Sequence, residues 1–365
     1  MIKHIRVFVA SLTLLVAIGA VASVAVAGDS DGHGKRVKGT FWVANRGANT
    51  IRAFDAASGD VLTTIPMAPN SQPGDLTYAR GKLYVSEEFG TPPAVAIVDA
   101  TTGVVLKRIL TGPRPHHMHV TRDGDLVSYG VFGTNRIGII DTRTDTLLGE
   151  WQASANPAAR SHAGVFSPDG DTVYVANDVG NELAALDPRT GTVRWTMAVP
   201  AAHELILSRD GETAYVTCRA VSELRVIDLE HQTVEATIPL GPLPDTLQLS
   251  RNGKQLTVGL RGTPAQLAIV DTRTLTFQTV TIAHGAGTIA GHQWTSPDGR
   301  VTYAAYEGQS AFPGEPTSGV AIIDHRQGND VVRRLEYLGR PHGLIFVRAH
   351  ENDDGDDDGD HEDDD

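Results

Sequence analysis

The stretch SPDGDTVYVANDVGNELAALDPRTG (167–191) contains the pattern that decides the fold. It begins with a Pro-Asp-Gly turn, continues through the segment VYVAN (173–177), and reaches a second apolar segment, LAALD (183–187), that ends in aspartate. Glycine supplies the positive φ that such a turn requires, and valine and tyrosine favour extended strands. The stretch therefore predicts two short strands bounded by turns.

Segments equivalent to VYVAN and LAALD recur along the chain. The further copies of the first segment are FWVAN (41–45), LYVSE (83–87), LVSYG (126–130), AYVTC (214–218), LTVGL (256–260) and TYAAY (302–306). The copies of the second segment all end in aspartate, at Asp55, Asp99, Asp141, Asp187, Asp228, Asp271 and Asp324. A residue required in every repeat is usually structural, so we expect these carboxylates to cap the turns that follow them.

With a short strand before and after this pair, each repeat holds four strands. One position near the start of the first strand holds Gly74 in one repeat and His116 in the next. From Gly74 onward, this position recurs at intervals of 42, 46, 41, 42, 46 and 51 residues. Four strands in about 40 to 45 residues is the spacing of a propeller blade. The chain enters at FWVAN with no inner strand before it and finishes with RPHGLIFV (340–347). We predict an all-β seven-bladed β-propeller with four strands per blade, in which the C-terminal strand joins the first blade and closes the ring.

These motifs resemble a known family. The segments VYVAN, AYVTC and SPDG are similar to the repeats of YVTN-type seven-bladed β-propeller proteins, and the resemblance covers roughly 40–347. It implies the fold and an exported or surface-layer setting, as in the bacterial and archaeal members. It says little about activity, because one fold hosts many functions.

The ends of the chain differ from the repeats. Lys3 and Arg6 precede the apolar run Val7–Val21, and Ala25-Val26-Ala27 matches a cleavage site for signal peptidase. The alternative, an uncleaved membrane anchor, is disfavoured by the shortness of the apolar run. We predict a secreted or periplasmic protein with a signal peptide (1–27), a flexible leader (28–39), the propeller (40–349) and an acidic disordered tail (350–365). The mature chain has no apolar stretch that predicts a transmembrane segment.

Cysteine content and charge exclude several classes of function. Cys218 is the only cysteine, so an intrachain disulfide and a c-type haem site are both excluded. Of the net charge of −13, eleven acidic residues lie in 351–365, which leaves about −2 for the rest of the chain. No nucleic-acid partner is expected from such a balance. For the tail, the alternative to disorder is weak calcium binding, since DDGDDDGD supplies oxygen ligands without matching an EF-hand loop.

Histidines gather at two adjacent positions near the starts of the innermost strands. Blade by blade, the first position holds His342, Gly74, His116, His162, His203, Asp245 and Gly291. The next position holds Gly343, Asp75, His117, Ala163, Glu204, Thr246 and His292. A propeller brings these positions together at one mouth of its channel. Imidazole suits zinc, copper, iron and nickel, and carboxylates can complete the shell. We predict a copper or zinc site whose ligands are His116, His162, His203 and His342, with His117, His292, Asp75, Glu204 and Asp245 as additional ligands or supporting residues.

This arrangement is similar to the multi-histidine copper centre at the hub of the nitrous-oxide reductase propeller. The resemblance implies copper and redox chemistry. The chain lacks the cysteine-containing copper domain of that enzyme, so the same reaction is not expected. The haem-d1 propeller of nitrite reductase is also similar by fold, but its c-type haem domain has no counterpart in this sequence.

Several alternatives remain open at the level of sequence. The histidines can instead hydrogen-bond neighbouring strands and water in a polar hub. The protein can then be a non-catalytic binding or cell-surface scaffold, with an unidentified small ligand or protein at the channel mouth, or a lactonase-like hydrolase. Catalytic residues are not identified: the chain has no G-x-S-x-G elbow and no phosphate-binding glycine loop.

Further polar residues lie beside these positions. Because side chains alternate along a strand, His119 shares a strand face with His117. It is either a further metal ligand deeper in the channel or a hydrogen-bond partner of a ligand. We interpret the loop charges Arg46, Arg136, Arg219, Arg261, Glu87 and Glu88 as solvated, with framing of a ligand as the alternative. The insertion 309–318, with Phe312 as its aromatic residue, is expected to form a loop near one mouth.

Overall fold

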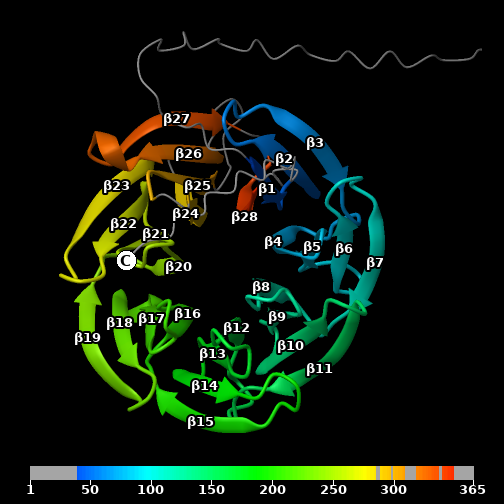
Figure 1. The fold of residues 1–365 in the computed structure, drawn as a ribbon, viewed down its shortest axis with the longest axis vertical. Helices are drawn as coiled ribbons and strands as arrows, with labels where there is room; N and C mark the ends of the chain where they lie inside the picture. Colours follow the sequence, from blue (N-terminus) through cyan, green and yellow to red (C-terminus); the bar gives the residue numbers. More distant parts are fainter. Residues whose placement is uncertain (1–38, 285–287, 297–298, 309–317, 337–338, 349–365) are drawn as a thin grey trace, which may run out of the picture. The chain divides into compact units, whose positions relative to one another are not determined.

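The computed structural model describes residues 39–284, 288–296, 299–308, 318–336 and 339–348. These residues form seven antiparallel sheets of four strands each, arranged as blades around a central axis (Figure 1). Two short 3₁₀ helices, η1 (Arg219–Val221) and η2 (His325–Gln327), occupy turns. The predicted seven-bladed propeller is therefore confirmed. No helix in the described part of the chain has the length and hydropathy needed to cross a membrane.

Each blade presents one strand to the channel, two strands in its middle and one at the rim (Figure 1). The inner strands are β4 (Pro73–Ala79), β8 (Pro115–Val120), β12 (Ser161–Phe166), β16 (Ala202–Leu207), β20 (Pro244–Leu249), β24 (Thr288–Thr295) and β28 (Pro341–Arg348). The second strands are β1 (Gly39–Asn45), β5 (Lys82–Glu87), β9 (Leu126–Val131), β13 (Val173–Asn177), β17 (Thr213–Cys218), β21 (Gln255–Leu260) and β25 (Val301–Gly308).

The outer half of each blade holds its third and fourth strands. The third strands are β2 (Thr50–Asp55), β6 (Ala94–Asp99), β10 (Arg136–Asp141), β14 (Glu182–Leu186), β18 (Glu223–Asp228), β22 (Ala265–Asp271) and β26 (Gly319–Asp324). The rim strands are β3 (Val61–Pro66), β7 (Val105–Leu110), β11 (Thr146–Gln152), β15 (Val193–Ala198), β19 (Thr233–Pro239), β23 (Phe277–Ala283) and β27 (Asp330–Glu336).

The ring closes within the first blade, as predicted. Strand β28, from the end of the chain, pairs antiparallel with β1, so the sheet order is β28-β1-β2-β3. Trp42 lies opposite Ile345 in this pairing, and Thr40 lies opposite Val347. The closure removes the free edge that both strands would otherwise expose.

The hydrophobic core lies between the blades. Each of seven buried clusters joins two neighbouring blades and none spans the channel. For example, Leu126 and Ile139 of one blade pack with Val173 and Val175 of the next. Burying an aliphatic side chain contributes about 1.5–3 kcal/mol. Because the apolar faces pack against each other between the blades, the fold does not need apolar side chains on the channel-facing positions.

The aspartates that close the third strands cap turns, as predicted. Asp99 Oδ1 accepts hydrogen bonds from the backbone N–H groups of Thr101 (3.0 Å) and Thr102 (2.7 Å). Equivalent bonds occur at Asp55, Asp141, Asp187 and Asp271. These carboxylates are engaged in their own turns, and none of them belongs to a group that could hold a metal ion among the described residues.

Candidate metal centre

A backbone irregularity at the start of each inner strand positions the histidines. The pairing between inner and second strands shifts register at the two repeat positions, for example between Pro115 and Met118, on either side of His116 and His117. The same shift occurs in the six other blades. A β-bulge bends the strand and re-aims its side chains. Consecutive residues therefore leave the normal alternation, which explains how both His116 and His117 reach the hub.

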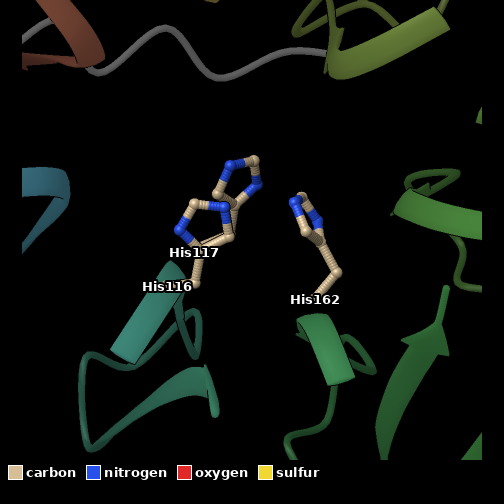
Figure 2. A group of neighbouring side chains, drawn as sticks. All are labelled: His116, His117 and His162. Atoms are coloured by element: carbon tan, nitrogen blue, oxygen red, sulfur yellow. The ribbon is translucent and has the colours of Figure 1, made fainter. Parts of the chain in front are cut away.

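The first group of facing imidazoles comes from two adjacent blades. His116 and His117 extend from β8, and His162 extends from β12 toward them (Figure 2). One ring nitrogen from each of the three lies within 4.8 Å of the other two. All three side chains are buried, and their ring centroids are 4.2–4.7 Å apart. This geometry can hold a metal ion.

Two more groups share residues with the first. His117 forms a group with His292 and His342, and His162 forms a group with His203 and Asp245, again with donor atoms within 4.8 Å. The Nε2 atoms of His117 and His292 are 3.0 Å apart. The three groups together include seven of the nine residues predicted as ligands. The hub therefore offers adjoining positions for more than one ion.

The remaining two predicted residues adjoin the groups. Asp75 Oδ2 accepts a 2.8 Å hydrogen bond from the Met118 N–H, and its Oδ1 lies 3.5 Å from His292 Nδ1. Glu204 Oε2 lies 2.9 Å from His117 Nδ1, but the direction does not satisfy a hydrogen bond. Asp75 thus fixes the strand that carries the histidine pair, whereas Glu204 faces His117 directly.

Carboxylates behind the rings fix the orientation of three histidines. The Nδ1 atoms of His116, His342 and His203 donate to Glu88 (2.6 Å), Glu307 (3.1 Å) and Asp178 (3.2 Å), respectively. A carboxylate only accepts, so the hydrogen lies on Nδ1, and the Nε2 lone pairs of His116 and His342 are left for another partner. His203 differs, because its Nε2 atom faces the Asp245 carboxylate and donates to it. Metal-binding histidines commonly have such carboxylate partners.

Sequence reasoning missed these carboxylates and misjudged their neighbours. Glu88 directly follows β5 and Glu307 lies near the end of β25, and they are only 1% and 0% exposed, which corrects our interpretation of Glu88 as a solvated loop residue. Glu87 is equally buried and is paired with Arg108 at 2.9 Å, so the same correction applies to it. The signal in the sequence was a charged residue that recurs at or just after the end of the second strand, at Arg46, Glu88, Asp178, Arg219, Arg261 and Glu307.

Arginines balance these carboxylates from outside. Arg46 Nη2 lies 2.5 Å from Glu88 Oε1, and Arg261 bridges Asp245 (2.9 Å) and Glu307 (3.2 Å). These two arginines are therefore paired and only partly exposed, not solvated as expected. Arg136 does not belong with them, since it begins β10 and donates instead to the Glu150 carbonyl.

Burial keeps most of the hub histidines uncharged. It lowers the pKa values of His116, His117 and His162, and adjacent imidazoles lower the last two further. Burial, with help from Arg46, also lowers the pKa of His342 to about 3. Neutral imidazole is the form that binds a metal ion.

The pKa values of Glu88, Glu204 and His203 are shifted by different balances of burial and neighbouring charge. Burial alone would raise the pKa of Glu88, but the Arg46 guanidinium and His116 outweigh it and hold the pKa well below its usual range. Burial raises the pKa of Glu204 well above normal, and the negative charges of Asp245 and Asp75 add to the rise. His203 has a raised pKa because Asp245 and Asp178 outweigh the effect of burial.

Three predictions fall outside the described residues or remain without a test there. The loop 309–317 with Phe312 and the acidic tail with its calcium alternative lie outside the described residues. The signal peptide and leader also lie outside them, so those boundaries stay predictions.

Comparisons with solved structures show the fold. A hydrazine synthase chain from Kuenenia stuttgartiensis is 21% identical, with a TM-score of 0.55 over 66% of this chain and 72% of that one. Dihydro-heme d1 dehydrogenase NirN, in complex with DHE, is 18% identical, with a TM-score of 0.60 over 84% and 75%. A protein of unknown function from Desulfotomaculum acetoxidans DSM 771 is 10% identical, with a TM-score of 0.67 over 85% and 99%. At these identities the likeness concerns architecture alone.

Comparisons at the sequence level point to one repeat family. The search of curated proteins finds no match. The PQQ_2 family model, described as outer membrane protein assembly factor BamB, matches residues 47–206 and 133–237, and the YVTN-type resemblance is not confirmed by it. The two matches overlap and together span more than half of the chain. The protein therefore belongs to this PQQ/BamB-like class of seven-bladed propellers.

Proposed function

We propose that this protein is an exported metal-binding propeller that holds copper or zinc ions at its histidine hub. The observation that carries the proposal is the group of His116, His117 and His162, whose buried ring nitrogens lie within 4.8 Å of one another. Export rests on the predicted signal peptide (1–27). Copper would add redox chemistry, and the fixed lone pairs of the hub suit either ion.

The distances support coordination after a small adjustment. A tetrahedral ion with bonds of about 2.0–2.1 Å to nitrogen separates its ligand atoms by roughly 3.4 Å. Rotation of the side chains would bring atoms that are at most 4.8 Å apart to this spacing. The Nε2 atoms of His117 and His292, which lie at hydrogen-bond distance (3.0 Å), would separate slightly to reach this spacing.

Unpaired polar atoms favour a metal over a hub that serves only hydrogen bonding. His117 Nδ1, His162 Nδ1 and Glu204 Oε2 are buried and have no hydrogen-bond partner among the described residues. Leaving a buried polar atom unsatisfied costs about 1–3 kcal/mol. A ligand shell around a cation gives such atoms a partner, whereas a purely structural hub would leave the cost in place.

Metal analysis of protein purified without a histidine tag tests the proposal. We expect near-stoichiometric copper or zinc, and a rise in melting temperature when metal-stripped protein is given either ion, because a ligand that binds only the folded state stabilises it. The double variant His116→Ala/His162→Ala should lose this rise. His231→Ala is the matched control, since this exposed histidine contacts only the Asp228 carboxylate and its turn. Metal-free protein that gains nothing from either ion would overturn the proposal.

A further inference from the structure

Two arginines lie at the hub mouth, the end of the channel at which the inner strands begin. Arg114 directly precedes β8 and Arg160 directly precedes β12, so both adjoin the strands that carry the first histidine group. Neither guanidinium forms an ion pair among the described residues. The other arginines beside the hub each lie within ion-pair distance of a carboxylate, and these are Arg46, Arg219, Arg261 and Arg340.

Phe132 connects this pair of arginines to the histidines. The Cζ atom of Arg114 lies 4.8 Å from the centre of the Phe132 ring, and that of Arg160 lies 5.9 Å from it. The same ring lies 5.3 Å from the His116 ring and 5.2 Å from the His162 ring. A guanidinium held over an aromatic face keeps the N–H groups at its edge free for hydrogen bonds. Phe132 therefore places two sets of donors beside the first histidine group.

Arg114 is held in surroundings that oppose its charge. Its Nε atom is buried and forms no hydrogen bond with the described residues. Burial lowers the pKa of this guanidinium, the Glu88 carboxylate opposes that shift, and the charges of Arg46 and Arg160 add to it. Buried polar groups in native proteins are nearly always bonded to protein, water or ligand. An anion between Arg114 and Arg160 would offset their repulsion and accept the missing hydrogen bonds.

Glu88, the carboxylate nearest to Arg114, does not neutralise the pair. Its Oε1 atom contacts Arg46 at 2.5 Å and His116 at 2.6 Å. Its Oε2 atom has no hydrogen-bond partner among the described residues. Even a direct bond from Arg114 to that atom would leave Arg160 without an anion. Three guanidiniums therefore share one carboxylate on this side of the mouth.

The acidic neighbour of Arg160 also leaves the pair unoccupied. The Asp178 N–H donates to the Arg160 carbonyl (3.0 Å), whereas the Asp178 carboxylate faces His203 Nδ1 at 3.2 Å. The charges of Asp178 and Glu88 weaken the attraction of the pair for an anion, but neither carboxylate occupies the guanidinium edges. Such edges match the geometry of carboxylates and of phosphate-like oxyanions, to which they donate two parallel N–H bonds.

We propose that Arg114 and Arg160 bind a small oxyanion, a carboxylate or a tetrahedral anion, and that this anion is the exogenous ligand of a metal ion held by the first histidine group. Three histidines fill three positions of a tetrahedral ion and leave one open. The role of the anion as a metal ligand rests on the proposed metal function, whereas the arginine site rests on its own contacts.

One arm of the test needs no metal. Crystals of metal-stripped protein soaked in selenate should show anomalous density between the two guanidiniums, and added acetate should displace it if the site prefers carboxylates. Arg160→Gln, a change at an exposed side chain, should weaken the density, and Arg114→Gln/Arg160→Gln should remove it. Arg136→Gln is the control, because this arginine is exposed and donates to the Glu150 carbonyl.

The other arm uses copper-loaded protein and azide. Titration of the azide–copper charge-transfer band should give an affinity at least tenfold weaker in Arg114→Gln/Arg160→Gln, several-fold weaker in Arg160→Gln, and unchanged in Arg136→Gln, with equal copper content in all of them. The difference should shrink at high salt, because screening weakens the attraction of exposed charges. Acetate or sulfate should compete with azide in the wild type.

The arms separate the two proposals. Selenate at the arginine pair of a protein that takes up neither copper nor zinc would keep the anion site and overturn the metal function. Copper binding with no selenate density at the pair, or with density that persists in the double variant, would overturn the anion site. Selenate at the pair together with an azide affinity that ignores both arginines would overturn the role of the anion as a metal ligand.

Discussion

Arg261 is the cation whose removal should cost the hub most. Its guanidinium lies 2.9 Å from Asp245 and 3.2 Å from Glu307, and both carboxylates are almost completely buried. Replacing Arg261 by methionine keeps much of the stem packing and deletes the charge. Breaking a buried ion pair by removing one partner typically destabilises a protein by about 3–5 kcal/mol.

The structure places the expected loss at the lower end of that range. Asp245 keeps a contact with His203, and Glu307 keeps Arg340 at 3.2 Å, so neither carboxylate is left without any partner. We therefore expect about 3 kcal/mol. For a domain of roughly 300 residues, with an unfolding entropy of about 2 cal/mol/K per residue, this lowers the melting temperature by about 5 °C.

Urea unfolding of metal-stripped protein, followed by tryptophan fluorescence, measures the loss directly. Arg136→Met is the control, because this exposed arginine meets only a backbone carbonyl and should change stability by less than about 0.5 kcal/mol. The pKa values of Asp245 and Glu307 are lowered in the folded protein, because Arg261, His203 and His342 outweigh the effect of burial. Their stabilisation is therefore present above the unfolded pKa of about 4 and lost as the pH falls. The difference in the free energy of unfolding between Arg261→Met and wild type should therefore shrink below that pH. A difference under about 1 kcal/mol at pH 7, or one that does not change with pH, would refute the reasoning.

Three further predictions concern other parts of the fold. Asp99→Ala removes the oxygen that caps the turn after β6, and should lower the urea concentration at the midpoint of unfolding, with an unchanged m value. Burial raises the pKa of the Cys218 thiol to about 12, so the native protein should not react with a thiol-specific disulfide reagent at pH 8 and should react fully in denaturant. The same shift contributes stability below the unfolded pKa of about 8.5, and this contribution should be lost as the pH rises toward 12. Leu344→Ala opens a gap beside Phe41 where β28 closes the ring; it should cost about 2–5 kcal/mol and raise the rate of proteolysis, and equal proteolysis of variant and wild type would contradict the role of this strand.

The fold could be predicted because its determinants are local and repeated. Each blade carries its own turn glycine, its own aspartate cap and its own apolar strands, so the seven copies reinforce one interpretation. The convergence of His116, His162 and His342 at the hub followed from the ring alone, since equivalent positions of a closed propeller must meet near its axis.

The surroundings of the hub were harder to predict because they depend on backbone geometry. Strict alternation would send His116 and His117 to opposite faces of β8, and only the register shift beside them brings both rings into the hub. The burial of Glu88 and Glu307 likewise depends on how the blades converge at the channel mouth. The sequence around a charged residue at the end of a strand does not show which residues of the neighbouring blade will bury it.

The order of charges around the axis is the strongest reason to regard the hub as a cation site. The imidazoles of His116 and His342 are innermost, Glu88 and Glu307 lie behind their Nδ1 atoms, and Arg46 and other guanidiniums lie against those carboxylates. A cation on the axis would therefore meet lone pairs first, carboxylates next and positive charge last. If the hub served only to hold the blades together, an apolar cluster of similar volume would do so without burying these charges, which cost several kcal/mol each to desolvate. The seven interblade clusters already supply that cohesion, so the buried polar hub favours the proposal that it binds a cation.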